Sequence, residues 1–280
     1  MQQSRVSKAG LRVPYDIIGD IAVLKIFDEP TARDLRSMAR VIMSRDRHIK
    51  TVLYQASPVG GRFRTRKLVW VLGQRKTSTV HKEYGCLFSV DLSRVYFSPR
   101  LLYERMRIAR LVQPGEVVVN MFAGVGCFSI IIARFSRARR IYSIDLNPVA
   151  VKFMEENVRL NGVGGRVVAL EGDAKDVVEQ RLRGIADRVL MPLPEKAYDY
   201  LPYALLALKD GGGWAHYYDF AHAGKGEDPV GLARAKVSDR LGSLGIEFSI
   251  PFGRIVRKVG PRYYQVALDI RARKRSPEGA

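Results

Sequence analysis

The sequence has 280 residues, 47% of them hydrophobic, which suits one large globular domain or a large and a small one, and its two cysteines, Cys86 and Cys127, exclude a disulfide scaffold and a cysteine-based zinc site. Its 47 Lys and Arg residues outnumber its 28 Asp and Glu residues, and the net charge of +19 favours nucleic acid as partner over an acidic membrane. The chain shows neither a secretion signal nor an uninterrupted apolar span, so we expect a cytoplasmic protein without membrane, metal or obligate protein partner.

Residues 1–80 predict a small α+β domain that contacts RNA. Residues 11–26 are rich in β-branched residues and are interrupted at Gly19, which indicates two short strands. A helix over 32–45 follows a capping Thr31, and further strands are expected from Thr51 and over 68–72. The basic run 62–67 mixes cations with one aromatic residue, a combination typical of a groove that follows a nucleic-acid backbone.

The rest of the chain alternates strand and helix. Residues 81–98 show strand-like alternation and connect to Pro99, which opens a helix over 100–111. Strands are predicted near 117–121, 140–144, 166–170, 187–191 and 213–218, and then over 248–256 and 263–270. This pattern predicts an α/β fold over 99–280, a doubly wound sheet whose ligand lies at the carboxyl ends of its strands.

One stretch within that domain indicates a nucleoside cofactor. The apolar strand from Val117 stops at Asn120 and gives way to Gly124-x-Gly126, a tight turn at which a ligand can approach the backbone and the next helix N-terminus. About 20 residues beyond, Asp145 ends the second strand, where an acid can accept both hydroxyls of a ribose. Ser129 stands where a dinucleotide fingerprint requires a third glycine, which disfavours a pyrophosphate ligand and an NAD-dependent dehydrogenase.

The glycine segment resembles motif I of the class I (Rossmann-like) S-adenosylmethionine-dependent methyltransferases, and the bulky Phe122 and Phe128 suit a nucleoside with a thioether arm. Asp173-Ala174, after the third strand, resembles the motif whose acid takes the adenine amino group. The resemblance implies S-adenosylmethionine as cofactor. The residues expected to bind it are Tyr96, Arg105, Phe122, Gly124, Gly126, Asp145, Leu146, Asp173, Ala174 and Leu193.

Nearly the whole chain resembles the tRNA guanosine-37 N1-methyltransferases of archaea and eukaryotes, through Tyr15-Asp-Ile-Ile-Gly-Asp-Ile-Ala, His81-Lys-Glu-Tyr-Gly-Cys, Val95-Tyr-Phe-Ser-Pro-Arg-Leu-Leu-Tyr-Glu-Arg105 and the glycine segment. Family members often carry a further N-terminal domain. No such segment stands before the β-rich residues of this sequence, so we expect a short form. The resemblance makes tRNA the partner and assigns two catalytic residues: Glu104 takes the proton from guanine N1, and Arg64 stabilises charge at O6. It places Arg62, Arg100, Pro192 and Pro194 at the substrate. We interpret His216, near a strand end, as structural.

The chain departs from that family at Pro192-Leu193-Pro194, where Asn-Leu-Pro is usual. Proline has neither a side-chain amide nor an N–H, so the usual contact of this Asn with the guanine cannot form. The substrate nucleoside is therefore either guanosine or the tricyclic wyosine precursor at the same tRNA position. Two alternatives remain: aminocarboxypropyl transfer from the same cofactor, disfavoured by Pro192 and by Ser98-Pro99-Arg100, and a non-catalytic RNA-binding protein.

Overall fold

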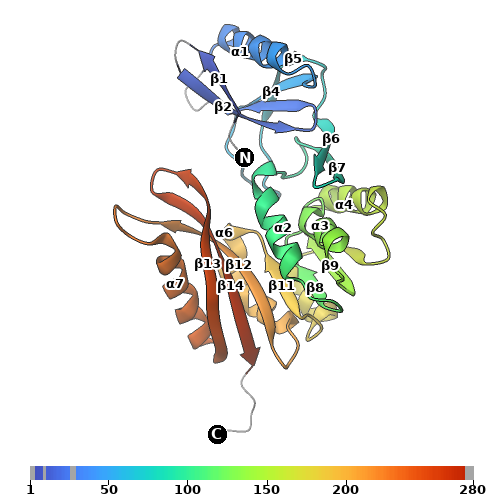
Figure 1. Cartoon of the computed structure of the whole chain (residues 1–280), viewed down its shortest axis with the longest axis vertical. Helices are drawn as coiled ribbons and strands as arrows, with labels where there is room; N and C mark the ends of the chain where they lie inside the picture. Colours follow the sequence, from blue (N-terminus) through green and yellow to red (C-terminus); the bar gives the residue numbers. More distant parts are fainter. Residues whose placement is uncertain (1–3, 9–10, 26–29, 275–280) are drawn as a thin grey trace.

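A computed structural model describes residues 4–8, 11–25 and 30–274 of the chain. Figure 1 shows a small unit built from the N-terminal part above a larger unit that contains the rest of the chain, with helix α2 (Leu102–Leu111) beneath the small unit. The small unit is a five-stranded sheet in the order β1-β2-β3-β4-β5. Its strands are β1 (Ser4–Lys8), β2 (Leu11–Ile18), β3 (Ile21–Leu24), β4 (Thr51–Gln55) and β5 (Leu68–Gly73).

Helix α1 (Ala32–Arg45) packs on this small sheet and connects the parallel pair β3 and β4. It begins where the sequence predicts, because Thr31 and Asp34 form a reciprocal capping box. One face of the helix, including Leu35, Met38 and Ile42, is buried in a separate hydrophobic core. The sequence analysis did not predict β1.

The larger unit is a seven-stranded sheet in the order β10-β9-β8-β11-β12-β14-β13. The first five strands are mutually parallel, and the last two form an antiparallel hairpin along β12. The strand order reverses between β8 and β11, which is where a doubly wound sheet binds its ligand. The strands are β8 (Val117–Asn120), β9 (Arg140–Asp145), β10 (Val167–Glu171), β11 (Arg188–Met191), β12 (Gly213–His222), β13 (Ile246–Gly260) and β14 (Tyr263–Lys274).

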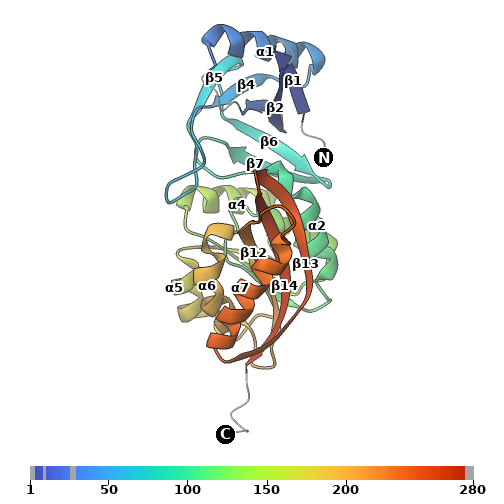
Figure 2. The same cartoon turned by 90° about the vertical axis from the view of Figure 1, so that its left-hand side faces the viewer.

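Side chains that alternate along these strands enter two cores, one on each face of the sheet. Val118 and Leu190 belong to the core under α2, α3 (Cys127–Phe135) and α4 (Pro148–Leu160), whereas Val119 and Met191 belong to the core on the opposite face. That second core includes side chains of α5 (Ala174–Val177), α6 (Pro194–Ala207) and α7 (Pro229–Ser243), which lie together in Figure 2. The predicted doubly wound fold is therefore confirmed.

A two-stranded hairpin of β6 (Ser78–Glu83) and β7 (Cys86–Asp91) lies between the two sheets. Asn157 on α4 and Asn161, the C-cap of α4, each form two hydrogen bonds with the β7 backbone, at Ser89 and Leu87 respectively. The hairpin is thus attached to the larger unit. The boundary expected at residues 80 and 81 falls inside β6, and the domain division remains a prediction.

The segment that leads into α2 differs from the sequence-based expectation. Strand structure was expected as far as residue 98, but β7 ends at Asp91 and no strand follows before residue 99. The helix expected from residue 100 starts instead as a 3-10 turn, Pro99–Leu101, with the Ser98 hydroxyl accepting from the Arg100 amide. A proline at the first helical position suits either form of helix, so the sequence could not distinguish them.

Candidate active site

The turn after β8 is shaped by its two glycines. Gly124 and Gly126 have φ values of 57° and 89°, in the left-handed region that favours glycine. A Cβ on Gly126 would also lie 3.0 Å from the Met154 side chain, so a larger residue here would require that side chain to shift by a few tenths of an ångström. Gly126 does not line the cavity described below but is the N-cap residue of α3. Its predicted contact with the cofactor remains a prediction.

Asn120 and Ser129 explain why this turn differs from a dinucleotide fingerprint. Both side chains are fully buried, and the Asn120 amide donates to the Ser129 hydroxyl over 3.1 Å. Ser143 on β9 donates to the same hydroxyl over 2.7 Å. The serine that replaces a third glycine therefore ties α3 to strands β8 and β9, and Asn120 is directed into the protein rather than toward a ligand.

Asp145 lies at the tip of β9, beside the glycine turn, as predicted. Its two carboxylate oxygens accept the backbone N–H groups of Gly124 at 2.7 Å and Asn147 at 2.9 Å. Burial raises the pKa of this carboxyl above its ordinary value, although the two N–H bonds oppose the shift. Because each carboxylate oxygen has two lone pairs, both can accept a further hydroxyl, as a ribose diol would require.

Asp173 occupies the corresponding place after β10. It caps α5 by accepting from the Lys175 amide, and both its oxygens lie 2.9 Å from the Tyr200 hydroxyl on α6. The Tyr200 ring meets the Phe122 ring edge to face, with centroids 5.3 Å apart. The sequence analysis missed Tyr200, which fixes the predicted adenine-binding acid and continues the aromatic wall.

These loops enclose a cavity of about 630 Å³, which is of the size that small-molecule sites usually have. The loops after β8, β9, β10 and β11 form one side, and residues 59–64, between β4 and β5, form the other. The predicted residues that line it are Arg62, Arg64, Tyr96, Arg105, Phe122, Gly124, Asp145, Leu146, Asp173, Ala174, Pro192 and Leu193.

Arg64 closes this cavity from the side of the small unit. Its guanidinium lies 4.3 Å from the centre of the Tyr96 ring and forms an ion pair of 2.8 Å with Glu195, in the first turn of α6. The Arg64 backbone has a φ of 52°, unusual for a residue other than glycine. The cavity is therefore lined by residues of both the small and the large unit. Glu195, which carries the charge opposite to that of Arg64, was not predicted from the sequence.

Arg105 lines the cavity, and both its Nη1 and Nη2 atoms are engaged within the protein, whereas its buried Nε has no hydrogen-bond partner in the described part of the chain. It is buried and donates to both oxygens of Glu83 at 2.5 and 2.6 Å and to the Ser98 carbonyl at 2.9 Å. Glu83, from β6, was not predicted as a site residue, although it lies inside a segment that carries the family resemblance. Arg105 thus shapes the wall through the Glu83 ion pair.

Glu104 does not line the cavity and is not on an exposed helix face. Only 1% of the residue is exposed, and its Oε2 accepts hydrogen bonds from Arg107 Nε and the Tyr218 hydroxyl, both 3.0 Å long. Its Oε1 lies 3.3 Å from Arg254 Nη1 and accepts no hydrogen bond within the described part of the chain. The neighbouring Leu101 and Arg105 do line the cavity, as does Phe128, whose ring packs against that of Tyr218. Glu104 therefore lies one side chain behind the wall.

Two further predicted substrate residues lie off the wall. Arg100 donates from Nε and Nη2 to Asp16 on β2, over 3.1 and 2.8 Å, and so joins the small sheet to the start of α2. Pro194 is the first residue of α6 and is buried. Neither residue lines the cavity, and their predicted contacts with the substrate remain predictions.

The described residues contain no group of three or more His, Cys, Asp or Glu side chains that could hold a metal ion. Within the same ranges, no helix combines the length and the apolar character needed to cross a bilayer. The cavity fits a nucleoside with an apolar arm: a carboxylate with free lone pairs at one strand tip, a second acid at the next, and aromatic side chains between them.

Comparison with known proteins matches both units. A family model described as the TRM5/TYW2 methyltransferase domain matches residues 79–234, and one described as the TYW2 N-terminal domain matches residues 6–77. The chain is 37% identical to Trm5b of Pyrococcus abyssi, a tRNA (guanine(37)-N(1))-methyltransferase, over 93% of this chain and 75% of that protein. It is 38% identical to Taw21 of Saccharolobus solfataricus, a tRNA 4-demethylwyosine(37)-methyltransferase, over 92% of this chain and 93% of that one. The solved structure of Methanocaldococcus jannaschii Trm5 in complex with adenosine has a TM-score of 0.78 at 32% identity, covering 93% and 74% of the two chains.

Proposed function

The chain belongs to the TRM5/TYW2 methyltransferase family, and we propose that it transfers a methyl group from S-adenosylmethionine to N1 of guanosine 37 in tRNA. One observation carries the proposal: a single cavity joins the glycine turn and Asp145 to Arg64 of the small unit, so that cofactor and target base can meet there. The similarity to Trm5b over 93% of the chain supports tRNA as the substrate class.

The residues that hold the cofactor follow from the chemistry of the wall. Asp145 would accept the ribose hydroxyls, the turn at Gly124 would let the cofactor approach the backbone, and Asp173 with Tyr200 would receive the adenine edge beside Phe122. When bound, S-adenosylmethionine supplies an electrophilic methyl group on a positively charged sulfur. The apolar and aromatic wall excludes water from that group.

Glu104 acts as the general base in this proposal. Guanine N1 carries a proton that must leave as N1 bonds to the methyl carbon; the proton passes to Glu104, and the electrons of the carbon–sulfur bond remain on sulfur. Support comes from the buried carboxylate and from Oε1, which is free of hydrogen bonds within the described chain. Because Oε1 faces Arg254, whose side chain is 33% exposed, a base that reaches this oxygen has to displace Arg254.

Arg64 supplies the positive charge near guanine O6 in this proposal. In the structure its guanidinium stacks on Tyr96 and pairs with Glu195, at the mouth between the small and the large unit. The Arg64 guanidinium lines the cavity, so to reach the substrate it needs only to exchange the Glu195 carboxylate oxygen for guanine O6. Its contribution to lowering the barrier is of the order of a few kcal/mol in a dry site.

A second substrate, 4-demethylwyosine at the same tRNA position, is favoured by Pro192. This residue lines the cavity where the family usually has an Asn, and it offers no amide to the guanine edge. The relative Taw21, which acts on 4-demethylwyosine, is matched over 93% of its length. The reaction would still be methyl transfer with the same base and cofactor.

The test is nucleoside analysis of treated tRNA. Two tRNA substrates that are identical except for guanosine or 4-demethylwyosine at position 37 are incubated with the protein and labelled S-adenosylmethionine, and the digested nucleosides are identified by mass. The proposal predicts one added methyl group on the guanosine substrate and none on a third, control tRNA that carries adenosine at position 37. Methyl transfer to the wyosine precursor alone would select the second substrate, and a gain of an aminocarboxypropyl group would reject methyl transfer.

A further inference from the structure

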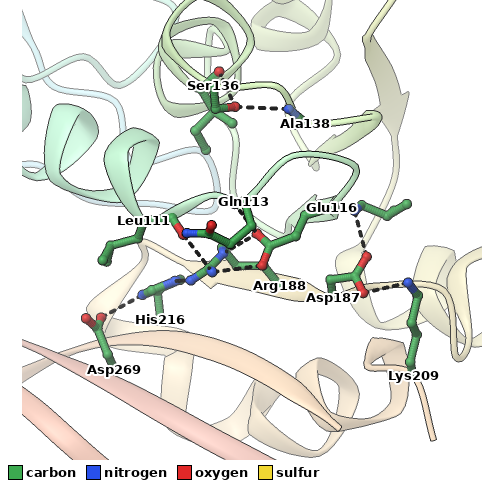
Figure 3. A network of polar contacts seen from close by, with 12 residues as sticks. Leu111, Gln113, Glu116, Ser136, Ala138, Asp187, Arg188, Lys209, His216 and Asp269 are labelled. Atoms are coloured by element: carbon green, nitrogen blue, oxygen red, sulfur yellow. Dashed lines mark hydrogen bonds and ion pairs between the residues drawn. The ribbon is translucent and has the colours of Figure 1, made fainter. Parts of the chain in front are cut away.

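A chain of buried polar and charged groups leads from β11, in the middle of the large sheet, to Glu104. Arg107 donates to Glu104 Oε2 through Nε and holds Asp269, on β14, through Nη1 at 2.6 Å and Nη2 at 3.2 Å. Asp269 in turn lies 2.6 Å from His216 Nδ1 on β12, and His216 Nε2 lies 2.7 Å from Arg188 Nη1 on β11. Figure 3 shows the part of this network from Asp269 through His216 and Arg188 to Glu116.

The direction of each hydrogen bond in this network is fixed by chemistry. Arg188 can only donate, so His216 Nε2 must accept and its single proton must be on Nδ1, donating to Asp269. Burial, followed by the nearby Arg188 and Arg107, lowers the pKa of His216 despite the opposing effect of Asp269, which keeps the imidazole neutral. Glu116 anchors Arg188 with two hydrogen bonds of 2.9 and 3.0 Å. The network therefore has one arrangement of donors and acceptors.

That arrangement treats the two oxygens of Glu104 differently. Oε2 accepts from Arg107 and Tyr218, whereas Oε1 accepts no hydrogen bond from any described residue and lies beside Arg254. Burial and the charge on Glu104 both raise the pKa of the Tyr218 hydroxyl, so Tyr218 remains a donor. The oxygen that has two donors is the poorer base, since its lone pairs are occupied.

We propose that Arg107, held in place by Asp269 and His216, is a positioning residue that fixes Glu104 so that Oε1 is the atom that takes the guanine N1 proton. The inference rests on the proposed function. It adds that Oε1 is the proton acceptor and that Arg107, Asp269 and His216 orient it. Arg107 never touches the substrate. It acts by occupying Oε2 and by preventing rotation of the carboxylate on α2.

The experiment compares Arg107→Gln with Arg110→Gln, a matched change on the same helix at an exposed residue outside the network. Single-turnover methylation of unmodified tRNA is measured from pH 5.5 to about 9, together with KM for tRNA and cofactor. Arg107→Gln is expected to lower the rate of methyl transfer about 10- to 100-fold with both KM values within about twofold. Its acid limb should move to higher pH, because the Glu104 carboxylate then keeps only Tyr218 and Arg254 as polar partners among the described residues. Arg110→Gln should keep the wild-type rate and profile.

A merely structural role for Arg107 would lower the melting temperature without moving the acid limb, and that result in a folded variant would overturn the proposal. If Arg107→Gln does not fold, Tyr218→Phe decides, because it removes the other donor to Oε2 without leaving a buried charge. It should slow transfer about tenfold and move the limb in the same direction, and an unmoved limb would refute the role of the occupied oxygen. Glu104→Gln distinguishes failure of the proposed base from failure of the positioning role. Full activity of Glu104→Gln would refute Glu104 as the base. An inactive Glu104→Gln together with an unaffected Arg107→Gln would refute only the positioning role of Arg107.

Discussion

Replacement of Asp145 by alanine tests the cofactor site. The carboxylate bridges the Gly124 and Asn147 amides in the structure, at 2.7 and 2.9 Å, and in the proposed complex it also accepts two ribose hydroxyls. A hydrogen bond to a charged group contributes about 1.5–3 kcal/mol, so loss of two corresponds to about 3–6 kcal/mol. At about 1.4 kcal/mol for each factor of ten, the Kd for S-adenosylmethionine should rise roughly 10²- to 10⁴-fold.

Isothermal titration calorimetry with S-adenosylmethionine and with its demethylated product measures this change. Asp176→Ala is the matched control, since it removes one exposed carboxylate from α5 close to the same site without touching the cavity wall. The Asp145 variant also leaves two amides without acceptors, which we expect to cost about 1–3 kcal/mol of folding free energy. Both variants therefore need a melting curve. Unchanged affinity in a folded Asp145→Ala protein would refute the ribose contact.

Further outcomes are expected for two other variants, for pH and for salt. Glu104→Gln should lower the methyl-transfer rate by about 10² to 10⁴ while tRNA and cofactor affinity stay within about twofold; equal losses in rate and affinity would contradict the base. Pro192→Asn should raise the rate on guanosine relative to 4-demethylwyosine by about tenfold, since it restores an amide donor, and an unchanged ratio of the two rates would count against Pro192 as a determinant. The free energy of unfolding should fall as the pH drops below about 6.5, because His216 protonates in the unfolded chain but has a lowered pKa in the folded one; urea titrations should show this slope reduced in His216→Gln. Burial alone would raise the pKa of Asp269, but its bonds to His216 and Arg107 lower it to about 2, so a second loss of stability is expected between about pH 4 and 2. Finally, tRNA affinity should fall steeply with salt, because a chain of net charge +19 displaces counterions from phosphates, and a flat salt response would exclude a phosphate-dominated interface.

The parts of the fold that local pattern determines could be predicted from the sequence. The glycine turn, Asp145 and Asp173 share a pattern of strand end followed by a polar or small residue, and parallel strands bring such ends to one edge of a sheet. The helix α1 was predicted to its ends because Thr31 caps it. The end of β7 was not, because this strand is held by hydrogen bonds from α4 that no local pattern encodes. The 3-10 turn at Pro99 was not either, because a proline at the first helical position suits both forms of helix.

The residues that the sequence analysis missed are partners of residues that it found. Glu83 pairs with Arg105 and Glu195 with Arg64, across separations in the chain that no local pattern encodes. Glu104 was assigned from a resemblance alone, and only the structure shows that it is buried behind the wall and bonded through one oxygen. The network through His216 depends on three neighbouring strands of the sheet, although the interpretation of His216 as structural agrees with it.

The most direct test of the central claim is the mass of the modified nucleoside in a tRNA whose only variable position is 37. The account predicts that the protein with S-adenosylmethionine converts guanosine 37 to its N1-methyl form, and that Glu104→Gln, folded and still binding the cofactor, does so about 10²- to 10⁴-fold more slowly. A protein that binds both tRNA and cofactor but leaves guanosine 37 and its wyosine precursor unmethylated would contradict it.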